Sequence, residues 1–180
     1  SKRTFLASEF FGRKIYTAQE GILLGVVKDL MVNQDLLEVA AIVTEKGDLV
    51  ERDLSLIPSG EVVLWGQDLV LVTHVEVIKA REEMPDFDKW VSVHDDLIGE
   101  QIIAVAGNRL GEVKDLLLGE QGRIEGYVVD EADHLPEQLT RSDGKHVYIP
   151  IIETHSLGSE MLIINPANLT ANSALSSLGK

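Results

Sequence analysis

The sequence contains no cysteine, and this absence excludes several kinds of site. Without thiols the chain can form no disulfide, no cysteine nucleophile and no cysteine-ligated metal centre. A chain without cysteine suits a reducing compartment, so we expect a cytoplasmic protein. No basic N-terminal segment is followed by an apolar run, so no signal peptide is expected.

Long hydrophobic runs and basic charge are also scarce. The longest apolar stretches are strand-sized and far below the ~20 residues that cross a bilayer, so membrane insertion is not expected. Thirty acidic residues outnumber 16 basic ones, which gives a formal charge of -14. This charge repels nucleic acid and anionic membranes, and it favours a protein partner with a basic face. Hydrophobic residues make up 44% of the 180, which is enough for a core.

An internal duplication organises the chain, because five short blocks occur twice in the same order. The blocks of the first copy are Gly12–Ile15, Gly25–Leu30, Leu37–Val39, Leu56–Pro58 and Gly66–Val72, and their counterparts are Gly99–Ile102, Gly111–Leu116, Ile124–Gly126, Tyr148–Pro150 and Gly158–Ile164. The spacing between counterparts increases after the third block, which places a short insertion between Val129 and Val147. We therefore predict a first domain over residues 1–76, a linker over 77–93, a second domain over 94–166 and a tail over 167–180.

Each copy is expected to form short β-strands, because β-branched runs alternate with Gly, Asn, Asp and Pro. This pattern predicts an all-β fold of two small barrels. Gly25 and Gly111 lie inside apolar strands, where glycine usually marks a bulge or a sharp bend. Pro58 and Pro150 end matched strands, since proline cannot donate to a central ladder.

Two aspartates, Asp29 and Asp115, occupy matched positions four residues after these glycines. An aspartate there can cap a turn through neighbouring backbone amides. The segments over residues 8–12 and 94–99 each predict a single helical turn that ends at glycine. The first part of the linker predicts a short helix that ends at Pro85.

The two tryptophans, Trp65 and Trp90, allow two interpretations. Tryptophan is enriched at binding hot spots, and copy two has Leu157 in place of Trp65. The alternative, which we favour, is that both side chains pack at the contact between the copies. Copies of about 70 residues have marginal cores, so we expect the two barrels to pack together and to bury linker aromatics between them.

An acidic segment of copy two, Asp130, Glu131, Asp133 and His134, is the main candidate for ion binding. Its letters match a helicase box, but the phosphate-cradling glycine loop that such a box requires is missing. Its oxygen ligands suit calcium or magnesium, although the spacing is not that of an EF-hand. We favour a solvated acidic turn, and we expect no metal and no cofactor.

Histidines are the other candidates for metal or proton binding. The chain has His74, His94, His134, His146 and His155, and the last three flank the insertion in copy two. A three-histidine zinc site requires them to converge, and their spacing does not predict convergence. The favoured interpretation is separate surface histidines, with proton buffering beside carboxylates as a looser alternative.

The repeated motifs resemble those of the PRC-barrel family. Gly12 with Ile15, Gly25–Asp29, Leu56–Pro58 and Gly66–Leu71 carry the resemblance, as do their counterparts in copy two. This domain is shared by the H subunit of the photosynthetic reaction centre and by a bacterial ribosome maturation factor. The resemblance implies a small β-barrel that contacts proteins, and it implies no catalytic residue. The H subunit has a transmembrane helix and the maturation factor has a different N-terminal domain, so neither function transfers whole.

These observations favour a non-catalytic protein-interaction or assembly module. The main form of this hypothesis is a peripheral subunit or assembly factor of a photosynthetic or other bioenergetic complex. A small barrel leaves strand edges to cover, so a homo-oligomer is also compatible with the sequence. The alternative hypothesis is a small-ligand or metal-ion sensor that uses the acidic and histidine region of copy two.

Overall fold

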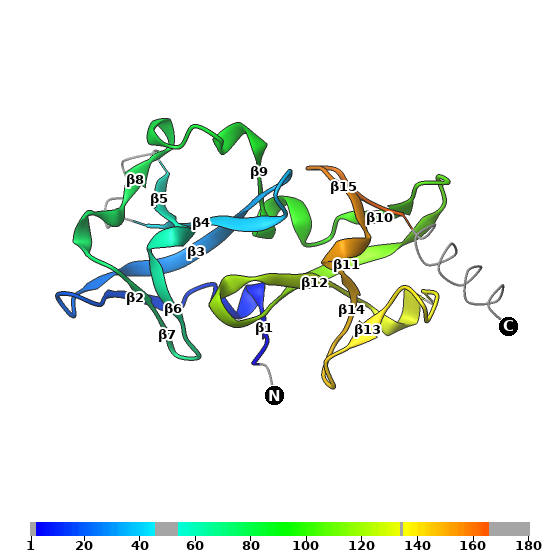
Figure 1. Ribbon diagram of the computed structural model, residues 1–180, viewed down its shortest axis with the longest axis horizontal. Coiled ribbons are helices and arrows are strands. Elements are labelled where there is room, and N and C mark those ends of the chain that lie inside the picture. The colour runs from blue at the N-terminus through cyan, green and yellow to red at the C-terminus, as the bar shows by residue number, and fades with distance from the viewer. Residues whose placement is uncertain (1–2, 46–53, 134, 166–180) are drawn as a thin grey trace, which may run out of the picture.

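The computed structural model describes residues 3–45, 54–133 and 135–165 (Figure 1). The predicted tail over 167–180 and the candidate ligand His134 lie outside the described residues. The described chain forms two eight-stranded sheets, one for each copy, which lie next to each other. Within the described ranges no helix is long and apolar enough to cross a membrane.

The first half is built from short strands and single helical turns. Its strands are β1 (Phe5–Leu6), β2 (Lys14–Thr17), β3 (Leu23–Asn33), β4 (Glu38–Thr44), β5 (Ser55–Pro58), β6 (Val62–Trp65), β7 (Leu69–Val72) and β8 (Lys79–Ala80). β9 (Trp90–Ser92) follows the linker turns and opens the second copy. Its turns are η1 (Ala7–Phe10), η2 (Ser59–Glu61), η3 (Val75–Val77), η4 (Arg81–Glu83) and η5 (Phe87–Lys89).

The second half repeats this order. Its strands are β10 (Gln101–Ala104), β11 (Arg109–Leu118), β12 (Ile124–Val129), β13 (Arg141–Ser142), β14 (Val147–Pro150), β15 (Thr154–Leu157) and β16 (Met161–Ile164). Its turns are η6 (Val93–Leu97), η7 (Glu120–Gly122), η8 (Glu131–Asp133) and η9 (Ile151–Glu153). The predicted insertion contains η8 and β13.

The two copies share one strand topology. The order is β6-β7-β2-β3-β4-β5-β8 in the first sheet and β15-β16-β10-β11-β12-β14-β13 in the second. In both, the strand after the first helical turn pairs in parallel with a late strand, β2 with β7 and β10 with β16. The predicted all-β class is confirmed. The pairing follows an open path in each copy, so closure of either sheet into a barrel stays a prediction.

A bulge lies beside each strand-interior glycine. Gly25 pairs with Ile15, and the register shifts at the next pair, which leaves Leu24 as the extra residue. Gly111 pairs with Ile102, with the same shift after it. A Cβ on Gly25 would lie 2.7 Å from Thr44 Oγ1, so close packing also requires glycine there. The bulges bend β3 and β11, which allows each long strand to pair with several neighbours.

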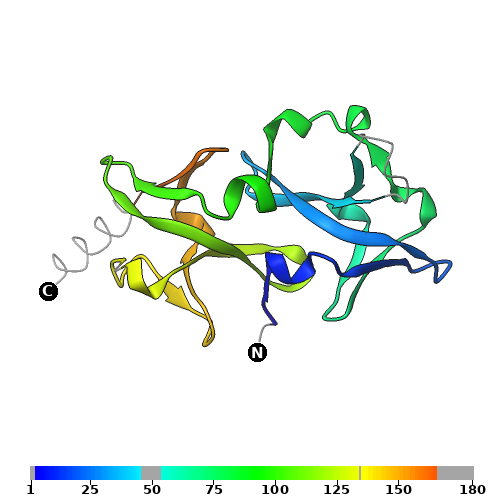
Figure 2. The ribbon, with the colours of Figure 1, turned by 180° about the vertical axis from the view of Figure 1, so that it is seen from behind.

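The N-terminal segment of each copy pairs with the long strand of the other copy (Figures 1 and 2). β1 is antiparallel to β11, with Leu6 opposite Leu117. β9 is antiparallel to β3, with Ser92 opposite Met31. These two pairings are equivalent in register, because each partner lies 86 residues from its counterpart. The copies therefore exchange segments reciprocally.

A helical turn follows each exchanged strand, as the sequence predicted. η1 is followed by Gly12 and η6 by Gly99, and both glycines adopt a positive φ, of 86° and 92°. Their amides donate to the long strand of their own copy, Gly12 to Val27 O at 2.7 Å and Gly99 to Val113 O at 2.8 Å. The exchanged segment thus returns to its own sheet directly after its turn.

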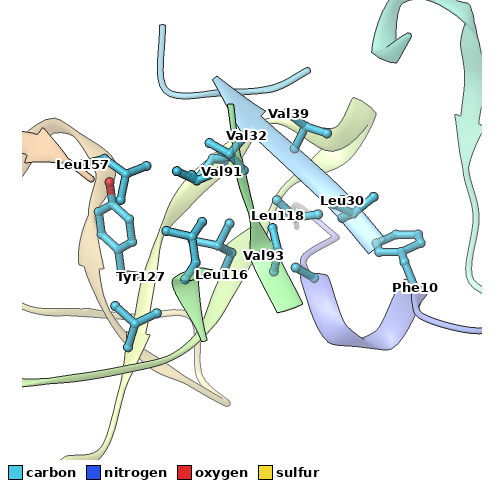
Figure 3. Packing of buried hydrophobic residues seen from close by; sticks show 14 of the residues in the cluster. Phe10, Leu30, Val32, Val39, Val91, Val93, Leu116, Leu118, Tyr127 and Leu157 are labelled. Carbon is cyan, nitrogen blue, oxygen red and sulfur yellow. The ribbon is translucent and has the colours of Figure 1, made fainter. Parts of the chain in front are cut away.

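A single hydrophobic core extends through both copies. Figure 3 shows its central part, with Leu30 and Val32 of copy one facing Leu116 and Leu118 of copy two. The predicted packing of the copies against each other is confirmed. Val91 and Val93, from the second exchanged segment, lie between them.

The linker aromatics pack elsewhere, so their predicted burial between the copies is wrong. Phe87 and Trp90 cover a separate cluster on copy one that is formed by Met31, Ala41, Val43 and Leu56. The physical reason is strand alternation, since Val91 enters the shared core and its neighbour Trp90 must point to the opposite face. The predicted linker helix is also replaced, by the short turns η4 and η5 and by β8, which pairs with β5.

Candidate interaction site

Two buried aspartates fasten the exchanged segments. Asp29 accepts hydrogen bonds from the Ser92 hydroxyl and from the His94 amide, the latter at 3.0 Å. It also accepts from the Leu30 amide at 2.7 Å. Only this last bond resembles the local capping that the sequence suggested, and the other donors come from the segment that opens copy two.

Asp115 repeats this arrangement from the other side. It accepts from the Ser8 hydroxyl, from the Ser8 amide at 3.2 Å and from the Leu116 amide at 2.8 Å. Burial raises the pKa of Asp115, although the hydrogen bonds from Ser8 and Leu116 oppose that effect. Asp29 and Asp115 are 9% and 6% exposed, so removal of either would leave buried donors without acceptors.

A cleft of about 540 Å³ lies between the copies. Leu36, Leu37 and Trp65 line it from copy one, and Gln121, Arg123 and Ile151 line it from copy two. Leu37 (φ 54°) and Gln121 (φ 64°) are the two described non-glycine residues with positive φ. Strained backbone of this kind is retained where the surrounding structure requires it, often at binding sites.

Trp65 forms part of the wall of the cleft and joins the two copies. Trp65 is 7% exposed, and its ring meets that of Phe10 edge-on, with centroids 5.4 Å apart and an interplanar angle of 82°. A Cβ on Gly122 of copy two would lie 2.6 Å from the indole nitrogen of Trp65. Trp65 therefore packs at the contact between the copies, and a role for it in recognition stays a prediction.

Comparison with known families agrees with this duplicated architecture. The model of the PRC-barrel domain matches twice, over residues 2–78 and 94–169. The chain belongs to the PRC-barrel family. PRC-barrel domains generally serve as protein-interaction modules. No curated protein matches the chain.

Trp90 lies outside the cleft, on the first PRC-barrel copy. It pairs through β9 with Asn33 and contacts Phe87, with ring centroids 5.4 Å apart. Its indole nitrogen is buried and has no hydrogen-bond partner among the described residues. Trp65 and Trp90 therefore do not form one surface, and a recognition role for Trp90 also stays a prediction.

The acidic segment of the second PRC-barrel copy serves local structure. Asp130 accepts from the Ala132 amide at 3.0 Å, and Asp133 approaches the Glu112 amide at 3.4 Å beside Gly111. Glu131 is exposed in η8. Across the described ranges no three His, Asp or Glu side chains are grouped so as to hold a metal ion. The described members of the candidate ion-binding segment, Asp130, Glu131 and Asp133, are therefore not grouped into a metal site.

The described histidines are not grouped into a metal site, and His74, His94 and His146 have local partners. His94 is exposed, and its hydrogen bond with Asp95 at 2.8 Å raises its pKa. His74 Nδ1 accepts from the Glu76 amide at 3.2 Å, and His155 is exposed on β15. His146 lies 3.4 Å from Asp143.

Asp143 has the largest set of local donors in the insertion. Burial would raise the pKa of this carboxyl, but the amides of His146 and Lys145 and the Thr4 hydroxyl outweigh it and hold the pKa well below its usual range. The bond from Thr4 Oγ1 measures 2.9 Å and connects the residue that precedes β1 with the insertion of copy two.

Glu100 is a buried acid that the sequence reasoning missed. It is 5% exposed, and neither carboxylate oxygen has a hydrogen-bond partner among the described residues. Burial, aided by nearby Asp96, raises its pKa to about 8. Copy one has Arg13 at the matched position, where it stacks 4.4 Å above the Phe10 ring and donates to Gly66 O at 2.6 Å. The replacement of a basic residue in copy one by an acidic residue in copy two was the feature of the sequence that could have identified Glu100 as unusual.

Proposed function

We propose that this PRC-barrel protein is a non-catalytic adaptor, which binds a protein partner across the cleft between its two copies. The observation that carries the proposal is that both copies supply walls of one cleft, with Leu36 65% exposed at its margin. Recognition at such a cleft requires the tandem arrangement, because neither copy alone provides both walls. The charge of -14 favours a partner with a basic face.

The proposal extends to an assembly role in the cytoplasm. The domain is shared with the H subunit of the photosynthetic reaction centre, and we propose that this adaptor is a peripheral subunit or assembly factor of a photosynthetic or other bioenergetic complex. The shared core supports this role, since it fixes the relative orientation of the two copies and thereby of whatever each copy binds.

Cross-linking in the native host tests the adaptor role. A photo-cross-linking residue replaces Leu36 or Gln121 at the cleft, and as a control Glu160, which is exposed in a turn of copy two outside the cleft lining. We expect a defined protein to cross-link from both cleft positions and to co-purify in fixed stoichiometry. Recovery of this protein alone from both cleft positions would contradict the proposal.

A small-ligand sensor is the second candidate. The sequence suggested the acidic and histidine region of copy two as its site, but the described residues there are not grouped to hold a metal ion, and the size of the cleft favours the cleft instead. A volume of about 540 Å³ falls within the range of small-molecule pockets, roughly 300–1,000 Å³. A thermal-shift screen with metal ions and metabolites separates the two functions, because a tight ligand raises the melting temperature by mass action. A saturable increase that is lost in Arg123→Ala would favour the sensor.

A further inference from the structure

We propose that the first PRC-barrel copy carries a second docking surface, which binds a protein whose apolar patch is ringed by lysine or arginine. The inference rests on the proposed adaptor function and adds a surface distinct from the cleft. We call this surface the outer patch, and we define it by the exposed side chains Ile22, Leu23, Val63, Leu64 and Val75.

Leu23 on β3 and Leu64 on β6 are joined by side chains of the two strands between them, β2 and β7, whereas Ile22 precedes β3 and Val75 lies in η3. Leu23 lies opposite Tyr16, and Tyr16 lies beside Leu71. Leu71 in turn lies opposite Leu64. Residues that are directly opposite share a face, and strands are about 4.8 Å apart, so these four side chains form an apolar row roughly 14 Å wide.

The patch concentrates the apolar exposure of the molecule. Its side chains are 50% (Ile22), 51% (Leu23), 56% (Val63), 48% (Leu64) and 40% (Val75) exposed. They are five of the ten large hydrophobic residues that are exposed in the described part of the chain. The row from Leu23 to Leu64 makes part of this exposure continuous, and Val63, the extra residue of a bulge opposite Leu71, extends it. Continuous apolar surface marks a site of association more often than scattered single residues do.

The second copy shows that the fold does not require these hydrophobic residues. Asn108 and Arg109 occupy the positions of Ile22 and Leu23, since Ile22 O accepts from Thr17 N and Asn108 O from Ala104 N, both at 2.9 Å. On the edge strand, Ser156 lies opposite Ile163 as Leu64 lies opposite Leu71. His155 occupies the position of Val63. All four counterparts are polar, so the apolar residues of copy one serve something other than the sheet.

The edge of the sheet points to the same conclusion. β6 is the terminal strand of its sheet, with β7 as its strand partner in the described chain, and η7 of copy two packs beside its Trp65 end. Exposed edge strands are usually protected from association by charge or proline. β6 instead reads Val-Val-Leu-Trp, whereas the matched strand β15 reads Thr-His-Ser-Leu.

The charge near the outer patch indicates what kind of partner binds there. Glu20, Glu61 and Glu76 lie within two residues of the patch in the chain, at the β2–β3 turn, before β6 and after Val75. These three acids outnumber the exposed Lys14, which lies on the same face of β2 two residues before Tyr16. A second copy of this chain would bring the same acids and a charge of -14 to the contact, and an anionic membrane would also be repelled. A protein with an apolar centre and a basic rim complements both features, with the charges raising the rate and the specificity of binding.

The first experiment is a matched pair of photo-cross-links in the full chain in its native host. The cross-linking residue replaces Val63 in copy one or His155 in copy two. We expect a protein adduct from position 63 and little from position 155, with the cross-linked peptide apolar and flanked by lysine or arginine. The yield should fall as salt is raised, because screening weakens the rim contacts.

The second experiment uses the cross-linked segment as a synthetic peptide. The variant Leu23→Arg/Leu64→Ser gives copy one the residues that copy two carries at these positions. We expect its affinity for the peptide to fall at least about tenfold, with the melting temperature unchanged because copy two already accommodates these side chains. The control variant Lys114→Ala, on the exposed face of β11, should bind like the wild type.

Several results would overturn the inference. They are an adduct between two copies of this chain at position 63, an adduct with lipid, a partner segment without basic residues, equal adducts from positions 63 and 155, or no adduct at position 63. Cross-links from Leu36 separate this inference from the adaptor role. A partner captured at Leu36 but not at Val63 removes only the outer patch, whereas no protein captured at either position removes both.

Discussion

Ser92 donates a hydrogen bond from its hydroxyl to the carboxylate of Asp29, which lies 63 positions earlier in the chain and in the other copy. The Ser8 hydroxyl donates in the same way to Asp115, 107 positions later, although Ser8 is not the repeat counterpart of Ser92. Each buried carboxylate thus holds the strand and turn that open the opposite copy. The same aspartates are part of the repeated motif by which the duplication is recognised, so the motif encodes the joining of the copies as well as the fold of each.

The first prediction concerns these aspartates. Asp29→Ala leaves the Ser92 hydroxyl and the His94 amide without their acceptor in a buried site, and we expect a loss of about 3 kcal/mol in the free energy of unfolding. Asp29→Asn keeps one acceptor oxygen, so its free energy of unfolding should fall by less. Urea denaturation at pH 7 measures both, with the exposed Asp68→Ala as control. Equal stability of Asp29→Ala and wild type would show that the exchanged segment is not held by this carboxylate.

The second prediction concerns cooperativity. Because one core extends through both copies, the chain should unfold in a single transition, with equal calorimetric and van't Hoff enthalpies. Phe10→Ala should cost about 3–5 kcal/mol and lower the temperature of that single transition, since Phe10 is 1% exposed and packs against Trp65. Two separate transitions in scanning calorimetry would indicate that the copies are independent.

The third prediction tests the contact between Gly122 and Trp65. Gly122→Ala introduces a Cβ that would lie 2.6 Å from the indole nitrogen at a residue with φ of 76°. Gly144→Ala is the matched control, because Gly144 has φ of 93° and no atom within 4 Å of its Cβ position. Positive φ should lower the free energy of unfolding of both variants by an amount on the order of 1 kcal/mol. Gly122→Ala should lower it further, and it should also shift the tryptophan fluorescence.

A double variant completes this test. Trp65→Leu installs the residue that copy two has at the matched position, and it removes the side chain with which the new Cβ collides. Gly122→Ala should therefore cost less in the Trp65→Leu background than in the wild type, which a double-mutant cycle measures. If the losses of stability caused by the two substitutions were additive, the new Cβ of Gly122→Ala would not be strained by contact with Trp65.

The fourth prediction concerns pH and Glu100. Its pKa is about 8 in the folded protein and near 4.5 in a free side chain, so between these values the folded state holds one proton more than the unfolded state. The contribution of Glu100 to stability should therefore fall as pH rises from about 4.5 to 8, by up to about 1.4 kcal/mol per unit, and level off outside that range.

Glu100→Gln isolates this contribution, because the amide has the same shape and does not ionise. The stability difference between variant and wild type should grow in favour of the variant from pH 5 to pH 8. Chemical denaturation at each pH measures it, and the difference cancels the titration of Asp115 and of the other groups. A difference that does not change with pH would mean that Glu100 is solvated in the folded state.

The sequence predicted those features that depend on local chemistry. Glycine in the middle of an apolar strand predicts a bulge, and bulges lie beside Gly25 and Gly111. Gly12 and Gly99 end their helical turns with positive φ, which favours glycine. The repeat itself was visible because both copies use the same residues at these sterically restricted positions.

The exchange of segments was not predictable in the same way. β1 has two residues and β9 has three, too few for a periodic pattern to indicate strand or partner. The donors Ser8 and Ser92 are also not counterparts in the repeat, so comparison of the copies did not connect them with Asp29 and Asp115. Glu100 was missed because burial of an acid depends on the packing of distant residues rather than on its neighbours in the chain.

The reciprocal pairing of β1 with β11 and of β9 with β3 is the geometry of a symmetric homodimer whose two subunits have been joined end to end. A covalent connection makes the association of the two halves intramolecular, so the pair persists at any dilution. It also allows the two halves to differ from each other in sequence. A true homodimer must display every surface twice, whereas this chain carries Leu23 once and Arg109 once at equivalent sites. A partner that recognises the apolar version therefore binds in a ratio of one to one.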